Sequence, residues 1–254
     1  MTEKITDEKS LLELPKVMHE PNIDIMPKKL GMIIFGPAKV GKTTFASEFP
    51  NSLIIEAEPN GADYCKCKKM DVMSLNEVRA IYKLLEKDTE IETVIIDSLD
   101  KIASWIELEV CEKIGISNIM ETKKSERFGS QWGVYKKDIL NLIDKFLELD
   151  KKIIFLSHTK KTETDGHGGI LNPKTINIYG SAAVEILAKV DNIGYMFCQK
   201  VEGKVKHFLS FEGGLNVEAG GRHPALSGKI IELTKGNGYN TFASLFKKTK
   251  KETK

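Results

Sequence analysis

The segment GPAKVGKT at residues 36–43 has the residue types and spacing that bind a polyphosphate. Gly36 and Gly41 allow the backbone to turn so that several N–H groups face one anion, and a helix that begins after them adds its partial positive charge. The lysine of this pattern, Lys42, reaches the β- and γ-phosphates, and the Thr43 hydroxyl binds Mg²⁺. The nucleotide-binding residues predicted from the pattern are Gly36, Pro37, Ala38, Lys39, Val40, Gly41, Lys42, Thr43 and Thr44.

A phosphate loop of this kind needs a second magnesium partner, an acid at the end of a neighbouring buried strand. Asp97 closes the apolar run TVIID at 93–97 and has this position in the sequence. Ser98 follows it and is expected to contact the magnesium ion indirectly, through a bound water molecule. We therefore predict that Thr43 and Asp97 hold Mg²⁺.

Hydrolysis also requires a group that orients or deprotonates the attacking water, a role worth ~10²–10⁴ in rate. Glu56 and Glu58 stand at the end of the apolar run SLIIEA, 52–57. Residues two apart on a strand share a face of the sheet. Periodicity therefore leaves the choice between the two open.

Short apolar runs alternate with longer amphipathic segments, and these elements must position the acidic and basic groups. Runs that are apolar on both faces are typical of a parallel sheet covered by helices. The predicted strands are LGMIIF (30–35), SLIIEA (52–57), TVIID (93–97) and KIIFLS (152–157).

Two segments between these runs have helical patterns. Apolar residues in 131–149 recur mostly at three- and four-residue spacings, which places them in one stripe. The segment 74–87 opens with Ser74 and Glu77, the spacing of a capping box. Strands that alternate with helices predict a doubly wound α/β domain.

The remaining segments set the expected domain organisation. Residues 1–29 carry three prolines and are predicted to be an irregular lead-in, since proline disfavours helix in the residue before it. Residues 30–198 form the predicted core. Two strand-like runs around Glu202–Gly203 indicate a hairpin, so 199–246 is expected to be a β extension of the same domain. Residues 247–254 are a basic tail.

The segments GPAKVGKTT, IIEAE, VIIDS and IIFLSH occur in the order of the RecA-type recombinase core, which the chain resembles over roughly 30–198. In that family the second strand ends in acid-Ala-Glu, and this Glu is the catalytic base. The resemblance therefore implies a RecA-like P-loop NTPase with Glu58 as the base and Asp97 as the magnesium acid. The absence of an Asn-Lys-x-Asp guanine reader favours ATP over GTP as the nucleotide.

A polar residue that closes the fourth strand senses the γ-phosphate in this family, usually a Gln after Asn. This chain has Ser157-His158 there, a departure that resembles smaller RecA-like ATPases of phages, including the fourth Sak group of single-strand annealing proteins. His158 can still donate a hydrogen bond to phosphate. The resemblance thus gives it a catalytic role beside Glu58 and Lys42.

The same resemblance implies single-stranded DNA as a partner, in recombination or annealing. Two segments occupy the places of the family's DNA loops, 115–130 and 160–187, where basic residues would neutralise phosphates and a tyrosine would stack on a base. A homo-oligomer is expected, with a possible single-strand-binding protein as accessory. The DNA-binding candidates are Lys123, Lys124, Arg127, Lys160, Lys161, Lys174 and Tyr179.

Related assemblies complete the ATP site with a basic residue of a neighbouring subunit. The candidates here are Lys204, Lys206 and Arg222. An alternative from another class is a nucleotide-dependent assembly ATPase whose partner is a protein. A small-molecule kinase would need an arginine-rich lid, whereas the three arginines are scattered. A GTPase would carry an Asn-Lys-x-Asp reader and an ABC-type ATPase a Ser-Gly-Gly signature, and the sequence has neither.

Composition excludes several other classes. The 254 residues are 41% hydrophobic and 29% charged, which is typical of a globular protein and unlike a disordered or collagen-like chain. The net charge of +2 means that a nucleic-acid surface must be a local patch. No apolar run reaches the ~20 residues that span a bilayer, so a cytoplasmic protein without membrane contact is expected. The C-x-C pair Cys65 and Cys67 is weak evidence for zinc.

Overall fold

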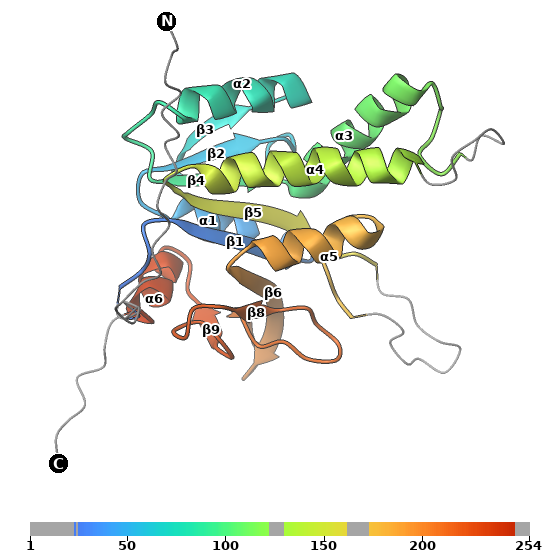
Figure 1. Cartoon of the computed structure of the whole chain (residues 1–254). Coiled ribbons are helices and arrows are strands. Elements are labelled where there is room, and N and C mark those ends of the chain that lie inside the picture. Colours follow the sequence, from blue (N-terminus) through green and yellow to red (C-terminus); the bar gives the residue numbers. More distant parts are fainter. Residues whose placement is uncertain (1–22, 24, 122–129, 162–172, 247–254) are drawn as a thin grey trace, which may run out of the picture.

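A computed structural model describes residues 23, 25–121, 130–161 and 173–246. Within these residues one sheet of nine strands forms the centre, in the order β3-β2-β4-β5-β1-β6-β7-β9, with β8 paired to β6 (Figure 1). The strands are β1 (Leu30–Gly36), β2 (Ser52–Glu56), β3 (Lys68–Asp71), β4 (Thr93–Asp97), β5 (Lys152–His158), β6 (Asn192–Val201), β7 (Lys204–Ser210), β8 (Gly220–Gly221) and β9 (Ile230–Leu233).

Helices cover both faces of this sheet. The helices are α1 (Lys42–Ser47), α2 (Leu75–Leu85), α3 (Leu99–Ile114), α4 (Ser130–Glu148), α5 (Gly180–Lys189) and α6 (Gly238–Ser244). One apolar core holds side chains of α2, α3, α4 and α5, and the other holds side chains of α1 and α6. None of the helices in the described ranges is long and apolar enough to cross a membrane.

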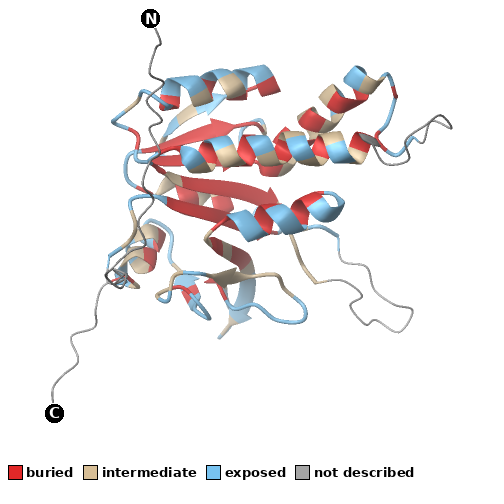
Figure 2. Ribbon diagram, viewed as in Figure 1, coloured by how far each residue is buried: buried red, intermediate tan, exposed pale blue. Residues whose placement is uncertain are grey.

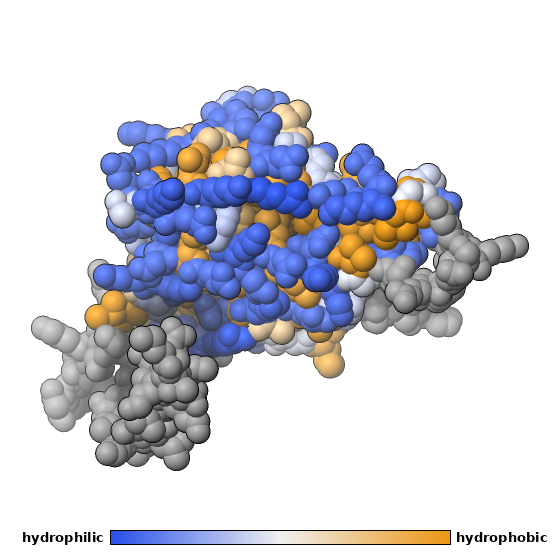
Figure 3. Space-filling view, turned by 45° about the horizontal axis from the view of Figure 1, so that its top comes forward, coloured by the Kyte–Doolittle hydropathy of each residue, from blue (hydrophilic) through white to orange (hydrophobic). Residues whose placement is uncertain are grey.

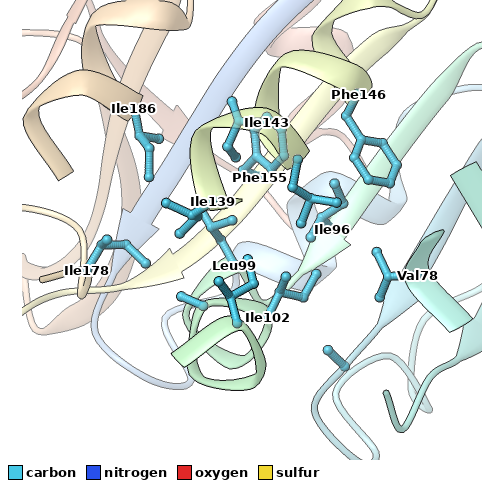
Figure 4. Close-up of a cluster of buried hydrophobic side chains, with 14 of the residues drawn as sticks. Val78, Ile96, Leu99, Ile102, Ile139, Ile143, Phe146, Phe155, Ile178 and Ile186 are labelled. Carbon is cyan, nitrogen blue, oxygen red and sulfur yellow. The ribbon is translucent and has the colours of Figure 1, made fainter. Parts of the chain in front are cut away.

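Strand β1 illustrates why the central strands are apolar on both faces. Its residues are all buried, and they alternate between the two cores: Ile33 and Phe35 in one, Met32 and Ile34 in the other. Figure 2 shows the same continuous burial in the neighbouring central strands. Figure 4 shows the first core, where Ile139 and other side chains of α4 lie over the sheet.

Local signals in the sequence correspond to observed helix ends. The side chain of Ser74 accepts a hydrogen bond from the backbone N–H of Glu77, while the Glu77 carboxylate accepts the N–H of Met73 at 2.6 Å. This is the predicted cap at the start of α2. The stripe predicted over 131–149 is helix α4.

The C-terminal strands extend the sheet rather than start a second one. Strand β6 pairs parallel with β1 and antiparallel with β7. Between β6 and β7, Glu202 and Gly203 have φ angles of 50° and 80°, the left-handed pair typical of a two-residue hairpin turn. The expected boundary at residue 198 falls inside β6. The region 199–246, expected to be β, also contains α6, whose Phe242 packs on Phe45 at 6.0 Å between ring centroids.

The predicted fold class is confirmed: a mostly parallel sheet flanked by helices, with antiparallel strands at the C-terminal side. Strand β5 lies between β1 and β4, and β4 pairs with β2. In register, Gly36 is opposite His158 and Glu56 is opposite Asp97. Four carboxyl ends therefore meet at one edge, which is where ligands bind in open α/β sheets.

Candidate functional site

The loop between β1 and α1 has the backbone of an anion-binding cradle. Lys39 and Gly41 adopt left-handed φ angles of 63° and 103°, which turns successive peptide groups toward one side. Gly36 is required for another reason, since a Cβ there would lie 2.3 Å from the carbonyl oxygen of Met196. Strand β6 therefore fixes how closely the loop can approach the sheet.

Lys42 is the first residue of α1, directly after this loop, and is 6% exposed. Its Nζ donates to the carbonyl oxygens of Gly36 and Pro37, both at 3.0 Å. Burial lowers the pKa of Lys42, and the nearby acids oppose this effect. The side chain is thus held over the loop, where the phosphates of a nucleotide would offer it stronger acceptors.

Thr43 and Asp97, the predicted magnesium pair, meet directly. The Thr43 hydroxyl donates to Oδ2 of Asp97 at 2.5 Å. Burial raises the pKa of Asp97, and the hydrogen bond from Thr43 opposes the rise. A hydroxyl and a carboxylate at one point are oxygen ligands of the kind that Mg²⁺ prefers, so the residues fit this ion.

Glu56 and Glu58 differ in their hydrogen-bond partners, a difference that strand periodicity could not predict. Strand β2 ends at Glu56, so the two-residue repeat does not extend to Glu58. Glu56 is 2% exposed; it accepts the N–H of Ala62 at 2.6 Å and the Nζ of Lys69 at 2.7 Å. Both of its oxygens are occupied by structural partners.

Glu58 instead lies beside His158. Its carboxylate accepts a hydrogen bond from the Ser98 hydroxyl, and one oxygen is 3.6 Å from Nδ1 of His158. Atoms of Glu58, Asp100 and His158 all lie within 4.8 Å of one another. Ser98, expected to act through water, therefore contacts Glu58 directly. The structure brings the predicted residues Lys42, Thr43, Asp97, Glu58 and His158 to one edge of the sheet.

Asp100 belongs to this cluster but was not predicted from the sequence. Its oxygens accept the backbone N–H of His158 at 3.0 and 3.3 Å, and Oδ2 lies 2.5 Å from Nδ1 of the ring. Although burial favours the neutral acid, hydrogen bonds from the side chains of His158 and Ser157 lower the pKa of Asp100. The sequence offered one indication of Asp100, its position in the first turn of the helix that follows Asp97. That position alone does not predict a functional residue.

The predicted DNA-binding residues divide into three groups. Lys123, Lys124 and Arg127 lie outside the described residues. Lys160 and Lys161 are exposed just after β5. Lys174 places its Nζ 5.2 Å from the ring centroid of Tyr195, beside the phosphate loop.

Tyr179 connects the starts of two helices. It is 46% exposed at the N-terminal end of α5, and its ring meets Trp132 of α4 edge-on at 5.7 Å. A residue just after the first predicted DNA segment thus meets one within the second. Trp132 was not predicted, because the helical pattern over 131–149 was identified from the spacing of other apolar residues.

A hollow of about 250 Å³ lies on the α1 side of the phosphate loop. Its lining includes Gly41 and Thr44 from the loop and α1, Thr234 from the segment before α6, and Gly238 at the start of α6. It is continuous with the loop at Gly41 and large enough for part of a small ligand. The C-terminal extension thus supplies one wall beside the predicted phosphate site.

The β6–β7 hairpin also contacts the phosphate loop. Nδ1 of His207 lies 2.8 Å from the carbonyl oxygen of Val40. Of the basic residues proposed to act in a neighbouring subunit, Lys204 is exposed at the hairpin turn, and Lys206 pairs with Glu232 at 3.0 Å. Arg222 lies at the opposite edge of the sheet, where it donates to the carbonyl oxygen of Ala188.

Residues 28–223 match the family model AAA_24, described as an AAA domain. The SPbeta prophage-derived uncharacterized protein YorG of Bacillus subtilis (strain 168) is 23% identical over 146 residues, which cover 54% of this chain and 44% of YorG. The chain therefore spans less than half the length of this curated relative.

Two archaeal structures align with most of the chain. The KaiC-like protein PH0186 of Pyrococcus horikoshii OT3 aligns with a TM-score of 0.47 and 15% identity, over 82% of this chain and 87% of its own. The flagellar accessory protein FlaH of Methanocaldococcus jannaschii aligns with a TM-score of 0.43 and 11% identity, over 82% of this chain and 85% of its own.

Proposed function

The chain belongs to the AAA_24 family of AAA domains, and from this membership we propose that it binds Mg²⁺–ATP and hydrolyses it. One observation carries the proposal. Lys42, the Thr43–Asp97 pair and Glu58 come from different segments and meet at the carboxyl edge of the sheet. One cluster thus contains candidate residues for phosphate binding, metal binding and activation of water.

The roles follow from the contacts. The loop N–H groups and Lys42 hold the β- and γ-phosphates, and Lys42 exchanges its two carbonyl partners for phosphate oxygens. Thr43 and Asp97 would hold Mg²⁺, whose charge would offset that of these phosphates. Glu58 accepts the proton of the attacking water, since its carboxylate faces the site and Glu56 is engaged by Lys69.

The nucleoside half of ATP has a place in the hollow between α1 and the segment before α6. The hollow adjoins Gly41 and Thr44, where the phosphate loop ends. Its mixed apolar and polar lining suits a base and ribose. We prefer ATP to GTP because the sequence has no guanine-reading motif.

We further propose single-stranded DNA as the partner, in phage or prophage recombination or annealing, with a homo-oligomer as the working form. The support is the sequence resemblance, the prophage origin stated for YorG, the exposure of Lys160 and Lys161 directly after β5, and the exposure of Tyr179. ATP bound at the edge of β5 would then alter residues that contact DNA, because Lys160 follows His158 by two positions.

The test is ATP hydrolysis by the purified chain with Mg²⁺, with and without a single-stranded oligonucleotide, beside the Lys42→Ala variant. We expect turnover that rises with the oligonucleotide and vanishes in the variant. If turnover does not change with DNA, the proposed ATPase activity stands but the DNA partner does not. That outcome would favour a protein partner and the assembly function. Absence of Mg²⁺–ATP binding would contradict the ATPase itself.

A further inference from the structure

Asp100 is a buried carboxylate that the ATPase roles above leave unused. It stands in the first turn of α3, and its side chain is 10% exposed. Its oxygens accept the backbone N–H of His158, and Oδ2 lies 2.5 Å from the Nδ1 of the same residue. Asp100 therefore fixes both the main chain and the ring at the end of β5.

His158 lies next to the place expected for a terminal phosphate. It is the register partner of Gly36, whose carbonyl oxygen accepts the Nζ of Lys42 at 3.0 Å. Lysine in this motif reaches the β- and γ-phosphates. The His158 side chain is 31% exposed, and within the described ranges its Nε2 has no hydrogen-bond partner. This nitrogen is available to a phosphate oxygen.

The contact with Asp100 decides which form of the imidazole can donate from Nε2. A neutral imidazole has a single N–H, and the Asp100 carboxylate places it on Nδ1. Nε2 then carries a lone pair, which repels phosphate oxygens. Only the imidazolium keeps its bond to Asp100 and also donates from Nε2.

Charged groups of three elements act on the ring: Asp100 of α3, Lys42 of α1, and Glu58 after β2. The hydrogen bond to Asp100 raises the pKa of His158, and Glu58 adds to the rise, whereas burial and Lys42 oppose it. The charged form therefore persists to higher pH than in a free histidine. It is lost as the pH rises through the raised pKa.

We propose that Asp100 is a positioning residue that holds His158 as an imidazolium, whose Nε2–H donates to the terminal phosphate and makes the site prefer a triphosphate to a diphosphate. The inference rests on the proposed ATP binding. It adds a partner for His158, a protonation state and a basis for discrimination between ATP and ADP. No bond breaks in this step, and the proton on Nε2 comes from water when the ring is protonated.

The experiment compares the affinities for ADP and for the non-hydrolysable β,γ-imido analogue of ATP, with Mg²⁺, from pH ~6 to ~9, around the ordinary histidine range. In the unmodified protein the preference for the triphosphate should fall about tenfold or more as pH rises, the size expected for a hydrogen bond between charged partners. A preference that does not change with pH overturns the proposal. This first measurement uses only the unmodified protein, so its outcome does not depend on whether a variant folds.

Two variants separate the role of Asp100 from a merely structural one. His158→Gln, whose amide donates at every pH, should keep a preference for the triphosphate without the pH dependence. Asp100→Asn should move the fall in preference to lower pH, and the imidazole resonances of His158 should titrate at lower pH. Unchanged pH dependence in both variants overturns the proposal. Loss of all nucleotide binding in the unmodified protein would instead refute the proposed ATPase.

Discussion

At the scale of single residues, Lys42 and Thr43 are held by partners that a nucleotide or a metal ion can replace. Lys42 donates to two loop carbonyls, and Thr43 donates to Asp97. Glu56, by contrast, has partners that belong to the fold. Contacts of the first kind indicate ligand binding, and those of the second kind indicate stability.

Lys42→Ala is expected to weaken Mg²⁺–ATP binding by at least tenfold, because hydrogen bonds to charged groups contribute roughly 1.5–3 kcal/mol each. The matched control is Lys87→Ala, an exposed lysine beyond the end of α2. Calorimetric titration of both variants checks this. Equal affinity in the two would show that Lys42 does not contact the phosphates.

Glu56→Gln should reduce the free energy of unfolding by about 1–3 kcal/mol, since it removes the charge of the buried Glu56 carboxylate from its pair with the partly exposed Lys69. Gln can still accept the N–H of Ala62. Chemical denaturation measures the loss. Turnover well below the unfolding temperature should stay near that of the unmodified chain, and a stable but inactive variant would make Glu56 the base.

The residue scale also shows how far the sequence could predict the site. The phosphate loop and Asp97 follow from spacing, because loop and strand end are local. The contact between Asp100 and His158 joins residues 58 positions apart and depends on β5 lying beside β1 and β4. Periodicity could not choose between Glu56 and Glu58, because the choice depends on contacts with Lys69 and Ser98 from other segments of the chain.

At the scale of elements, strand ends, helix starts and the β6–β7 hairpin lie around the phosphate loop at the carboxyl edge of the sheet. Trp132 and Tyr179 join the first turns of α4 and α5 there. Capping and turn chemistry could be predicted for α2 and the hairpin, since a few neighbouring residues determine them. Helix α6 was missed because it is a short helix that packs through Phe242 on distant residues.

Tyr179→Ala should lower single-stranded DNA affinity by about 1–3 kcal/mol if a base stacks on this ring. Val184→Ala on the same helix is the control, since Val184 is also exposed. Fluorescence anisotropy with a labelled oligonucleotide gives both affinities. Equal values would remove Tyr179 from the DNA surface.

The paired change Lys160→Ala and Lys161→Ala should make the slope of log affinity against log salt less steep. The expected reduction is about 0.7 for each DNA phosphate that the two lysines neutralise. Lys87→Ala, far from the carboxyl edge, should leave the slope unchanged. An unaltered slope in the paired variant would mean that these exposed lysines contact solvent rather than DNA.

At the scale of the whole molecule, the site is built at some expense to stability. Burial raises the pKa of Asp97. The ligand-free folded state therefore stabilises the ionised carboxylate less well than the unfolded state does. A folded pKa above the unfolded value means stability is lost as pH rises through that interval. Figure 3 shows that hydrophilic side chains cover much of one face of the molecule.

Asp97→Asn should therefore raise the unfolding temperature of the ligand-free protein by about 2–4 °C, the shift that ~1 kcal/mol gives a domain of this size. The same variant should lose most of the stabilisation by Mg²⁺–ATP, which reaches about 2.7 kcal/mol at a hundredfold excess over Kd. Differential scanning calorimetry with and without Mg²⁺–ATP tests both effects. A variant stabilised by Mg²⁺–ATP as strongly as the unmodified chain would exclude Asp97 from the metal site.

The most direct test of the ATPase is to measure ATP binding and ATP turnover together in Glu58→Gln. Gln preserves the shape of the side chain and its contact with Ser98 but cannot accept a proton from water. We predict binding close to that of the unmodified chain and turnover reduced by ~10²-fold or more. Normal turnover in Glu58→Gln would contradict the assignment of Glu58 as the catalytic base.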